Sequence, residues 1–280
     1  MQLDSTSVAQ NLRGKRGYPR TVARLLQHIV EDPRPCSYLP DASASLEVRV
    51  LVDVSPEEVD VLFERGWRRF GAVYFRPACV PCGECVTLRI VVGDFAPTKS
   101  QKRAAKATAH LRRVVGRPVV DDARLALYRR WHTNREASRG WEASQLDADR
   151  YRNDFAFPHP CAREVTFYDD AANKLVGVGI VDETPRMLSA AYFYYDPDYA
   201  KLSLGTANVL GLVEDARKKG KPHVYLGYRV RGCASLAYKE TFGPHEVLVG
   251  RPELDEPPEW RRSSDDGPAP APAPARDTET

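Results

Sequence analysis

Four cysteines are the residues whose spacing most directly suggests chemistry. Cys79, Cys82 and Cys85 lie three positions apart, and Cys36 precedes them by more than forty positions. Four thiols can bind zinc in a tetrahedral site or hold an iron–sulfur cluster, and this spacing permits both. Three cysteines at intervals of three are a weaker zinc motif than two Cys-x-x-Cys pairs. The set therefore leaves zinc, an iron–sulfur cluster and metal-free thiols open.

A second chemical signal is the run from Lys99 to Arg113, which carries six Lys or Arg residues and no acid. If the run is helical, its basic side chains recur at spacings of three and four and share one face, while its alanines favour the helix. A cationic ridge of this kind binds a phosphate backbone without reading base sequence. A solvated helix face is the alternative, but the absence of acids favours nucleic acid.

The helices and strands that must position these residues are predicted from the periodicity of apolar side chains and from capping and turn residues. Residues 1–35 are basic and contain a short amphipathic helix over 22–30. Alternation predicts a strand over 47–53, and Ser55, Pro56 and Glu58 predict a capped helix that ends at Gly66. Strands over 72–76 and 85–92 would pair and hold the cysteines at a hairpin-like tip.

After the basic helix the pattern predicts two further helices, over 122–135 and 146–155. From residue 163 the sequence pattern changes to apolar, β-branched and aromatic runs that are typical of strands. The predicted elements are strands over 164–168, 174–181 and 187–195 in an antiparallel meander, a helix over 203–218, a strand over 223–228, a helix over 234–241 and a strand over 245–249. This order is that of acetyltransferase-like (GNAT) cores, although another α+β domain could share it.

The predicted fold class is therefore α/β (α+β) in two domains. Residues 1–35 form a basic arm, 36–118 a small α+β domain with the cysteine cluster and basic helix, and 119–251 a GNAT-like domain with a mixed sheet flanked by helices. Residues 252–280 are rich in Pro, Ala, Asp and Ser, cannot bury enough apolar area to offset their ordering entropy, and are expected to be a disordered tail.

Several motifs together resemble the aminoacyl-tRNA–protein transferases, the arginyl and leucyl enzymes. In the second half these are Tyr192–Asp198, Leu202–Thr206, Tyr225–Tyr228, Gly232-Cys233 and Tyr238-Lys239. In the first half they are Cys36–Pro40, Phe70 with Tyr74–Pro77, Cys82–Ile90 and Ser100–Arg103. The resemblance covers residues 36–249. It implies transfer of an amino acid from a charged tRNA to the N-terminal amine of an acceptor protein, which marks that protein for degradation in the N-degron pathway.

The reaction that this resemblance implies needs few catalytic groups. The aminoacyl ester is already activated, and an α-amine with a pKa of about 7.7–8.0 is partly a neutral nucleophile at neutral pH. Most of the rate acceleration should therefore come from holding the amine against the ester carbonyl. A hydrogen-bond donor for the tetrahedral oxyanion and an acceptor for the amine proton should add to it. No cofactor is required for catalysis, and neither domain suggests use of ATP.

Candidate site residues follow from this chemistry. Asp196 would accept the amine proton or hold the ammonium, although Asp-Pro also suits a turn. Tyr228 and Ser203, with Gly205 and Thr206 at a helix start, would bind the ester end, and Tyr192 would line the pocket. Because the family favours acceptors with N-terminal Asp or Glu, Arg76 and Arg89 would bind the acceptor carboxylate or be structural. The residues predicted to bind tRNA are Lys99, Gln101, Lys102, Arg103, Lys106 and Arg113.

Composition limits the remaining choices. The formal net charge is +3, and no apolar window of about 18 residues exists, so no transmembrane helix is expected. The N-terminus lacks a signal-peptide pattern, and we expect a cytoplasmic enzyme whose partners are aminoacyl-tRNA and acceptor proteins, with no membrane and no DNA. The short chain favours leucine as the donated amino acid, with arginine as the alternative. Two other classes stay open: an acyl-CoA-dependent N-acetyltransferase, which would need a glycine-rich pyrophosphate loop, and a non-catalytic RNA-binding module.

Overall fold

The computed structural model describes residues 23–139 and 143–263 and forms two units. The first unit combines Met1–Val91 with Tyr225–Thr280, and the second is Val92–Val224. This division differs from the predicted boundary at residue 118, because the strands that follow Tyr225 return to the first unit and pair with one of its strands. Among the described residues, no helix has both the length and the apolar character needed to cross a membrane.

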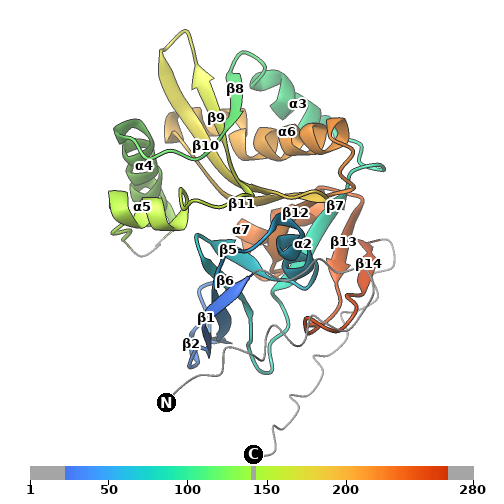
Figure 1. Ribbon diagram of the computed structural model, residues 1–280. Coiled ribbons are helices and arrows are strands. Elements are labelled where there is room, and N and C mark those ends of the chain that lie inside the picture. The colour runs from blue at the N-terminus through green and yellow to red at the C-terminus, as the bar shows by residue number, and fades with distance from the viewer. Residues whose placement is uncertain (1–22, 140–142, 264–280) are drawn as a thin grey trace, which may run out of the picture. The chain divides into compact units, whose positions relative to one another are not determined.

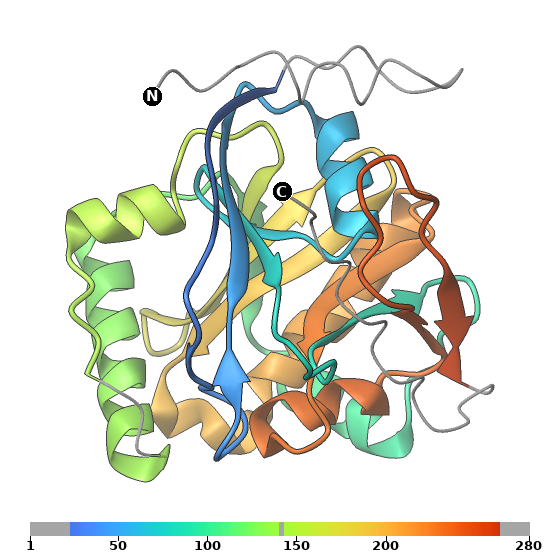
Figure 2. The same ribbon diagram turned by 90° about the horizontal axis from the view of Figure 1, so that it is seen from below.

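A four-stranded antiparallel sheet forms part of the first unit. Its order is β1 (Arg24–Val30), β4 (Leu46–Val52), β6 (Val73–Pro77) and β5 (Arg68–Phe70). Figure 2 shows β1 and β4 as two long neighbouring ribbons. The helix predicted over residues 22–30 is wrong, because this segment forms backbone bonds with β4 and leaves nearly all its side chains exposed. A short pair, β2 (Arg34–Pro35) with β3 (Ser43–Ala44), follows it.

The predicted capped helix is confirmed as α2 (Pro56–Glu64). The backbone N–H of Glu58 donates to Ser55 Oγ at 3.2 Å, and the N–H of Ser55 donates to Glu58 Oε2 at 2.8 Å. Both bonds satisfy amide groups that a helix start leaves without intrahelical partners. The buried Val59, Leu62 and Phe63 are on the face that faces the core of this unit.

A second group of strands in the first unit has the order β14 (Trp260–Arg262), β13 (His245–Leu248), β7 (Val86–Val91) and β12 (His223–Arg229), of which β12 begins in the second unit. Between β12 and β13 lie α7 (Ala234–Ala237) and η2 (Tyr238–Thr241). The predicted hairpin around the cysteines is wrong: β6 pairs with β4 and β5, whereas β7 pairs with β13. The expected tail is also ordered as far as residue 263, because β14 pairs with β13; residues 264–280 lie outside the described part.

The second unit is built on the predicted antiparallel meander. Its strand order is β11 (Met187–Tyr195), β10 (Lys174–Glu183), β9 (Ala162–Asp169) and β8 (Arg112–Gly116). Helix α6 (Leu204–Lys218) packs on β11 and against α3 (Lys99–Ala107), while α4 (Asp122–Arg139) contacts β10 and β11 (Figure 1). Two short helices, α5 (Ala148–Asp154) and η1 (Pro197–Leu202), complete the unit. The predicted β-β-β-α-β-α-β order is confirmed.

The basic run is only partly helical. Helix α3 ends at Ala107, and Arg112 and Arg113 lie on strand β8, so the prediction of one helix from Lys99 to Arg113 is wrong at its end. Thr108 is the C-cap of α3, and its hydroxyl donates to Ala104 O at 3.0 Å. The β-branched Val114 and Val115 that follow favour the strand, which pairs with β9.

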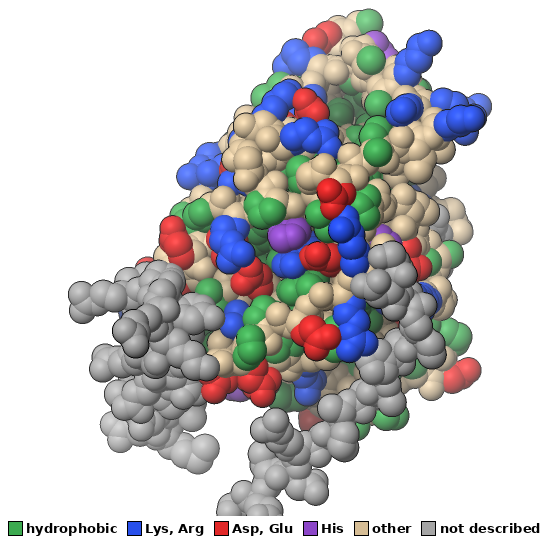
Figure 3. All heavy atoms as spheres, turned by 90° about the vertical axis from the view of Figure 1, so that its right-hand side faces the viewer, with side chains coloured by type: hydrophobic (Ala, Val, Ile, Leu, Met, Phe, Trp, Pro, Cys, Tyr) green, Lys and Arg blue, Asp and Glu red, His purple; other side chains and the backbone are tan. Residues whose placement is uncertain are grey.

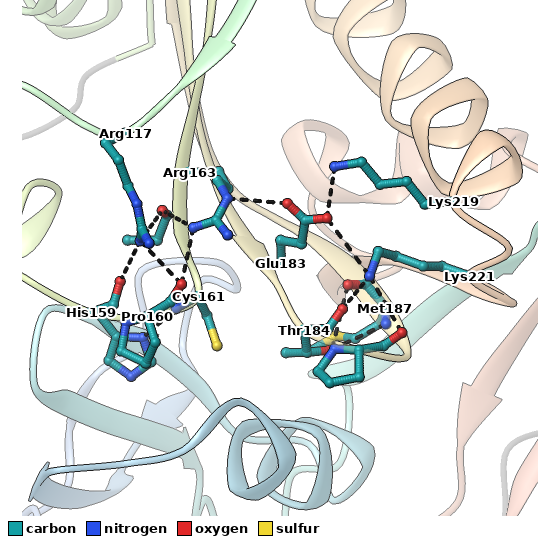
Figure 4. A network of polar contacts seen from close by, with 12 residues as sticks. Arg117, His159, Pro160, Cys161, Arg163, Glu183, Thr184, Met187, Lys219 and Lys221 are labelled. Atoms are coloured by element: carbon teal, nitrogen blue, oxygen red, sulfur yellow. Dashed lines mark hydrogen bonds and ion pairs between the residues drawn. The ribbon is translucent and has the colours of Figure 1, made fainter.

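A polar network holds the strand ends of the second unit together (Figure 4). The Arg117 guanidinium donates to the carbonyl oxygens of His159, Pro160 and Ala162 at 3.0–3.2 Å. Arg163 Nε lies 3.1 Å from Glu183 Oε2, and Lys219 Nζ lies 2.7 Å from Glu183 Oε1. These contacts satisfy backbone carbonyls where β9 begins and the Glu183 carboxylate where β10 ends, so the network has a structural role.

Candidate functional site

The basic surface of α3 consists of Lys99, Lys102, Arg103 and Lys106, which are all exposed. Within residues 23–139 and 143–263, none of the four forms an ion pair with a carboxylate. Lys and Arg side chains also gather in Figure 3 over the part of the second unit that contains α3 and α6. Unneutralised cations on a short, solvent-facing helix are suited to a phosphate backbone.

Two residues predicted to bind tRNA have other roles. Gln101 is buried, and its Oε1 accepts from Thr98 N at 2.9 Å, which completes the capping box of α3. Arg113 lies on β8, and its Nη2 is 2.6 Å from Asp215 Oδ2 on α6. The structure therefore brings together four of the six predicted residues and assigns Gln101 and Arg113 to the scaffold beneath them.

The start of α6 gathers Ser203, Gly205 and Thr206, as the sequence predicts. Ser203 has a left-handed backbone with φ of +57° and makes no side-chain cap bond, and the first turn carries no acid. The first backbone N–H groups of a helix point along its axis and favour anionic or carbonyl oxygens. Gly205 faces the ring of Phe193, which a Cβ would meet at 3.9 Å. This helix start is suited to hold an acyl oxygen.

Asp196 is fully buried and contacted on both oxygens. Lys174 Nζ lies 2.5 Å from Oδ2, and Oδ1 accepts from Asp198 N at 3.0 Å and faces Arg130 Nε at 3.3 Å. Burial alone would raise the pKa, but the bonds from Lys174 and Asp198 and the two cations outweigh it and lower the pKa of this carboxyl. A carboxylate held charged in this way caps the η1 turn and is a poor proton acceptor. Its predicted catalytic role stays a prediction, and the contacts favour the turn role.

Tyr192 belongs to an aromatic cluster between β11, α4 and α5. Its ring packs against Phe155 at 5.3 Å and Trp131 at 5.9 Å between centroids, and its hydroxyl lies 2.9 Å from His132 Nε2. Burial raises the pKa of Tyr192, and the nearby Tyr128 adds to that shift. Such surroundings keep the phenol neutral and fix the ring, as expected for a residue that shapes a pocket wall or a core.

Tyr228 lies in the first unit, where its hydroxyl is 2.9 Å from Gly66 O and 3.2 Å from Phe75 O. Burial raises the pKa of this phenol, with opposing effects from Arg68 and Arg76. The hydroxyl therefore donates to the backbone of its own unit. The structure gives Tyr228 a scaffold role, and the ester-binding role predicted for it has no support from these contacts.

The two arginines predicted to bind the acceptor are occupied by internal acids. Arg76 is almost fully buried and donates to Glu47 Oε2 at 2.6 Å, Glu253 Oε1 at 2.7 Å and Pro252 O at 2.7 Å. Arg89 Nε lies 2.8 Å from Glu246 Oε2, and its Nη1 is 3.0 Å from the Tyr225 hydroxyl. Acids and oxygens of the protein itself already occupy donors on every side of the Arg76 guanidinium and on both sides of that of Arg89, so the geometry favours the structural alternative for both.

Sequence reasoning missed two other cations of the first unit, Arg68 and Lys239. Both approach the backbone of Gly227, and a Cβ at that position would lie 3.7 Å from Arg68 Nε and 3.7 Å from Lys239 Nζ. Tyr238-Lys239 is one of the motifs behind the family resemblance, so the sequence does contain an indication that Lys239 is a functional residue. The signal for Arg68 is weaker, because it precedes a second arginine on a short strand.

The four cysteines lie close enough to influence one another. Burial, and after it the nearby Cys79, Cys36 and Cys82, raise the pKa of the Cys85 thiol to about 12. In the described part of the chain, however, no group of three or more His, Cys, Asp and Glu residues is arranged to hold a metal ion. Cys79 Sγ instead contacts Ser45 N at 3.4 Å. The described geometry does not fit a metal, and zinc or an iron–sulfur cluster stays a prediction.

A hollow of about 490 Å³ lies in the second unit. It is lined by Arg117, Pro118, Ala156, Phe157, Pro158, His159, Pro160 and Ala162. None of the predicted site residues lines it, and the guanidinium of Arg117 is used by backbone carbonyls. The hollow therefore belongs to the scaffold network of Figure 4 and not to the predicted acyl site.

Comparison with known proteins identifies the family. The family profiles described as arginine-tRNA-protein transferase, N terminus, and arginine-tRNA-protein transferase, C terminus, match residues 34–103 and 123–249. The aspartate/glutamate leucyltransferase of Helicobacter hepaticus is 32% identical over 236 residues, which cover 84% of this chain and 97% of that protein. The enzyme of the same name from Campylobacter jejuni is 33% identical over 228 residues, 79% of this chain and 92% of that protein.

Among solved structures, the crystal structure of FemX aligns with 73% of this chain and 69% of its own at a TM-score of 0.45 and 9% identity, a likeness too weak to carry an argument. The sequence relatives are decisive, because they match nearly their whole length at about one residue in three. The chain belongs to the family of aminoacyl-tRNA–protein transferases and is an aminoacyltransferase.

Proposed function

We propose that this protein transfers leucine from leucyl-tRNA to the N-terminal amine of proteins that begin with Asp or Glu. The observation that carries the proposal is the near full-length match to relatives named aspartate/glutamate leucyltransferases. The reaction forms an amide bond between the leucyl carbonyl and the acceptor amine and breaks the ester bond to the tRNA, whose ribose oxygen takes up the proton that the amine loses and becomes a hydroxyl. The acceptor thereby gains a leucine that marks it for degradation.

The second unit supplies the features that support binding of the donor. Lys99, Lys102, Arg103 and Lys106 on α3 are suited to the tRNA backbone, because they carry charge that no described acid neutralises. The start of α6 at Ser203 would face the developing oxyanion with backbone N–H groups. Preorganised donors of this kind act without a metal, so catalysis would consist mainly of positioning.

We infer that the strand and helix order from β9 to β13 corresponds to an acetyltransferase-like core, and that the enzyme works in the cytoplasm. The order β-β-β-α-β-α-β supports the first inference. The second follows from the substrate, since charged tRNA is made and used there. An acyl-CoA donor is disfavoured because residues 202–207, around the start of α6, contain one glycine, Gly205, where a pyrophosphate loop would need several.

A mixture of charged tRNAs decides the donor. Purified protein is incubated with total aminoacylated tRNA, in which leucine alone carries a heavy isotope so that its mass differs from that of isoleucine, and with two peptides that start with Asp and with Glu, and the product masses are measured. A gain of one leucine residue supports the proposal. No transfer from any charged tRNA contradicts it, as does acetyl transfer to the peptides in a parallel incubation in which acetyl-CoA replaces the charged tRNA.

Arginine is the second candidate donor, because both matching family profiles are described as arginine-tRNA-protein transferases. The same experiment separates the two donors, since leucine and arginine add different masses. A product that carries arginine alone would replace leucine in the proposal and leave the family assignment unchanged.

A further inference from the structure

Two cationic side chains meet in the first unit beside a residue without a side chain. Gly227 has a φ of +77°, and a Cβ built on it would contact Arg68 Nε and Lys239 Nζ, each at 3.7 Å. The two cations therefore flank one point of the β12 backbone. Gly227 is partly exposed, as is Lys239, so this point opens to solvent.

The guanidinium of Arg68 is positioned by its surroundings. The side chain is 5% exposed, and Nη1 donates to Trp67 O at 2.6 Å. Its Cζ lies 5.2 Å from the ring centroid of Phe63, 5.4 Å from that of Tyr225 and 5.6 Å from that of Tyr228. Aromatic faces hold a guanidinium in one orientation and shield it from water.

Lys239 reaches the same point from η2. Its Nζ donates to Tyr228 O at 2.7 Å, a bond that fixes the amine in place. Burial and the nearby charge of Arg68 lower the pKa of Lys239 to about 7, against a smaller opposing effect of Cys233 and Cys85. An anion between the two cations would offset both causes of this shift and hold Lys239 charged. The site therefore favours an anion that can contact both side chains.

We propose that Arg68 and Lys239 bind the side-chain carboxylate of the acceptor's N-terminal Asp or Glu, with Gly227 leaving room for it. This inference rests on the proposed function and assigns its acceptor subsite. It replaces Arg76 and Arg89, whose guanidinium groups are bonded to Glu47, Glu253 and Glu246.

A carboxylate fits this place better than a tRNA phosphate. Arg68 is almost entirely buried and enclosed by rings, so it can receive a small group but not an extended backbone. The exposed cations of α3 in the other unit have the accessibility that a phosphate chain needs. A backbone phosphate near the acceptor end of the tRNA is therefore an outcome of the test and not the proposal.

The test compares two acceptor peptides that differ only at the first residue, Glu and its neutral isostere Gln. For Lys239→Met, KM for the Glu peptide should rise about ten- to hundredfold, as expected for loss of one charge-assisted bond. The kcat and the KM for charged tRNA should change little. Because the Gln peptide lacks the carboxylate, its binding, measured as competitive inhibition where it is not a substrate, should stay unchanged.

Two further variants separate charge from packing. Lys239→Arg keeps the charge and should retain most of the preference for Glu over Gln, and Arg68→Lys should retain part of it. The matched control is Lys218→Met on α6, where the ammonium faces Glu214 at 3.2 Å and no change is expected. Thermal unfolding of every variant verifies folding.

The outcomes are distinguishable from failure of the proposed function. If the wild type transfers no amino acid from any charged tRNA, the proposed function fails. If the wild type is active but Lys239→Met weakens Glu and Gln peptides equally, or raises KM for tRNA instead, the acceptor subsite is overturned and the donor reaction stands.

Discussion

Glu47 shows how a buried carboxylate organises the first unit. Its Oε2 accepts from Arg76 Nε at 2.6 Å, and its Oε1 lies 2.9 Å from both Arg49 Nη2 and His28 Nε2. Burial by itself would raise the pKa of this carboxyl, but the charge and bond of Arg76, with Arg49 and His28, lower it below its ordinary value of 4.5. The partners come from separate strands, so the cluster ties β1, β4 and β6 together.

We predict that Glu47→Gln lowers the free energy of unfolding by about 1–3 kcal/mol at pH 7, because it leaves buried cations without their carboxylate. A carboxyl with a lowered folded pKa stabilises the fold above its unfolded pKa and loses that effect as the pH falls through the folded value. The difference in free energy of unfolding between wild type and variant should therefore have its largest value at pH 7 and decrease below pH 4.5. Urea unfolding at several pH values measures it.

The matched control is Glu214→Gln, which removes an exposed pair with Lys218 and should change the free energy of unfolding by less than about 1 kcal/mol at any pH. If the loss of unfolding free energy caused by Glu47→Gln stays constant from about pH 7 down to about pH 3, the lowered pKa of Glu47 does not contribute to stability and the prediction is contradicted.

Partners such as these also mark the limit of sequence reasoning at the residue scale. Arg76 bonds to Glu47 and Glu253, which are 29 and 177 positions away. Because residue 76 is an arginine, the sequence indicated that it binds a carboxylate. Only the fold decides whether that carboxylate belongs to the protein or to a substrate. The α6 start, by contrast, depends on consecutive residues from Ser203 to Thr206, and the sequence located it.

At the scale of elements, capping and turn signals predicted helix starts and the meander, whereas the helix expected over residues 22–30, the C-terminal end of α3 and the strand pairings around the cysteines were predicted wrongly. The capping box of Ser55 and Glu58 and the meander from β9 to β11 depend on neighbouring residues and turns, and both were predicted. The pairing of β7 with β13 joins segments more than 150 positions apart, and no local pattern specifies it. The segment Arg24–Val30 became a strand because β4 supplied hydrogen-bond partners that its own sequence does not reveal.

Helix α3 allows a direct test of donor binding. We predict that Lys102→Ala with Lys106→Ala weakens binding of tRNA and lowers the slope of log affinity against log salt by about 0.7–0.9 for each phosphate that the helix no longer neutralises. Alanine favours the helix, so the weaker binding would come from charge and not from unfolding. Binding is measured with uncharged tRNA at several salt concentrations.

The control for α3 is the pair Arg112→Ala and Lys218→Ala, which removes two cations that face Asp170 and Glu214. If charge in general attracts tRNA, both double variants should show the same decrease in affinity and slope. The prediction requires a larger decrease for the α3 pair, and equal decreases would contradict a specific surface on that helix.

At the scale of the whole chain, residues 252–263 are part of the first unit. The buried Arg65 donates to the carbonyl oxygens of Glu253 and Glu256, both at 3.1 Å, and Arg76 donates to Pro252 O. Arg89 Cζ lies 3.8 Å above the ring of Trp260, which also packs edge-on against Tyr225. Composition suggested a tail here, because Pro and acidic residues bury little area, yet their carbonyl oxygens satisfy buried guanidinium groups.

Removal of this segment should therefore destabilise the protein even though it contains no predicted site residue. We predict that a chain ending at Arg251 has a Tm lower by at least several degrees, because two buried arginines lose acceptors at about 1–3 kcal/mol each, and 1 kcal/mol corresponds to about 2–4 °C for a chain of this size. Trp260→Ala should give part of that decrease, and Arg261→Ala, whose exposed side chain faces Glu259, should give almost none. Thermal unfolding of the three variants beside the full chain measures the effect, and an unchanged Tm for the shortened chain would contradict it.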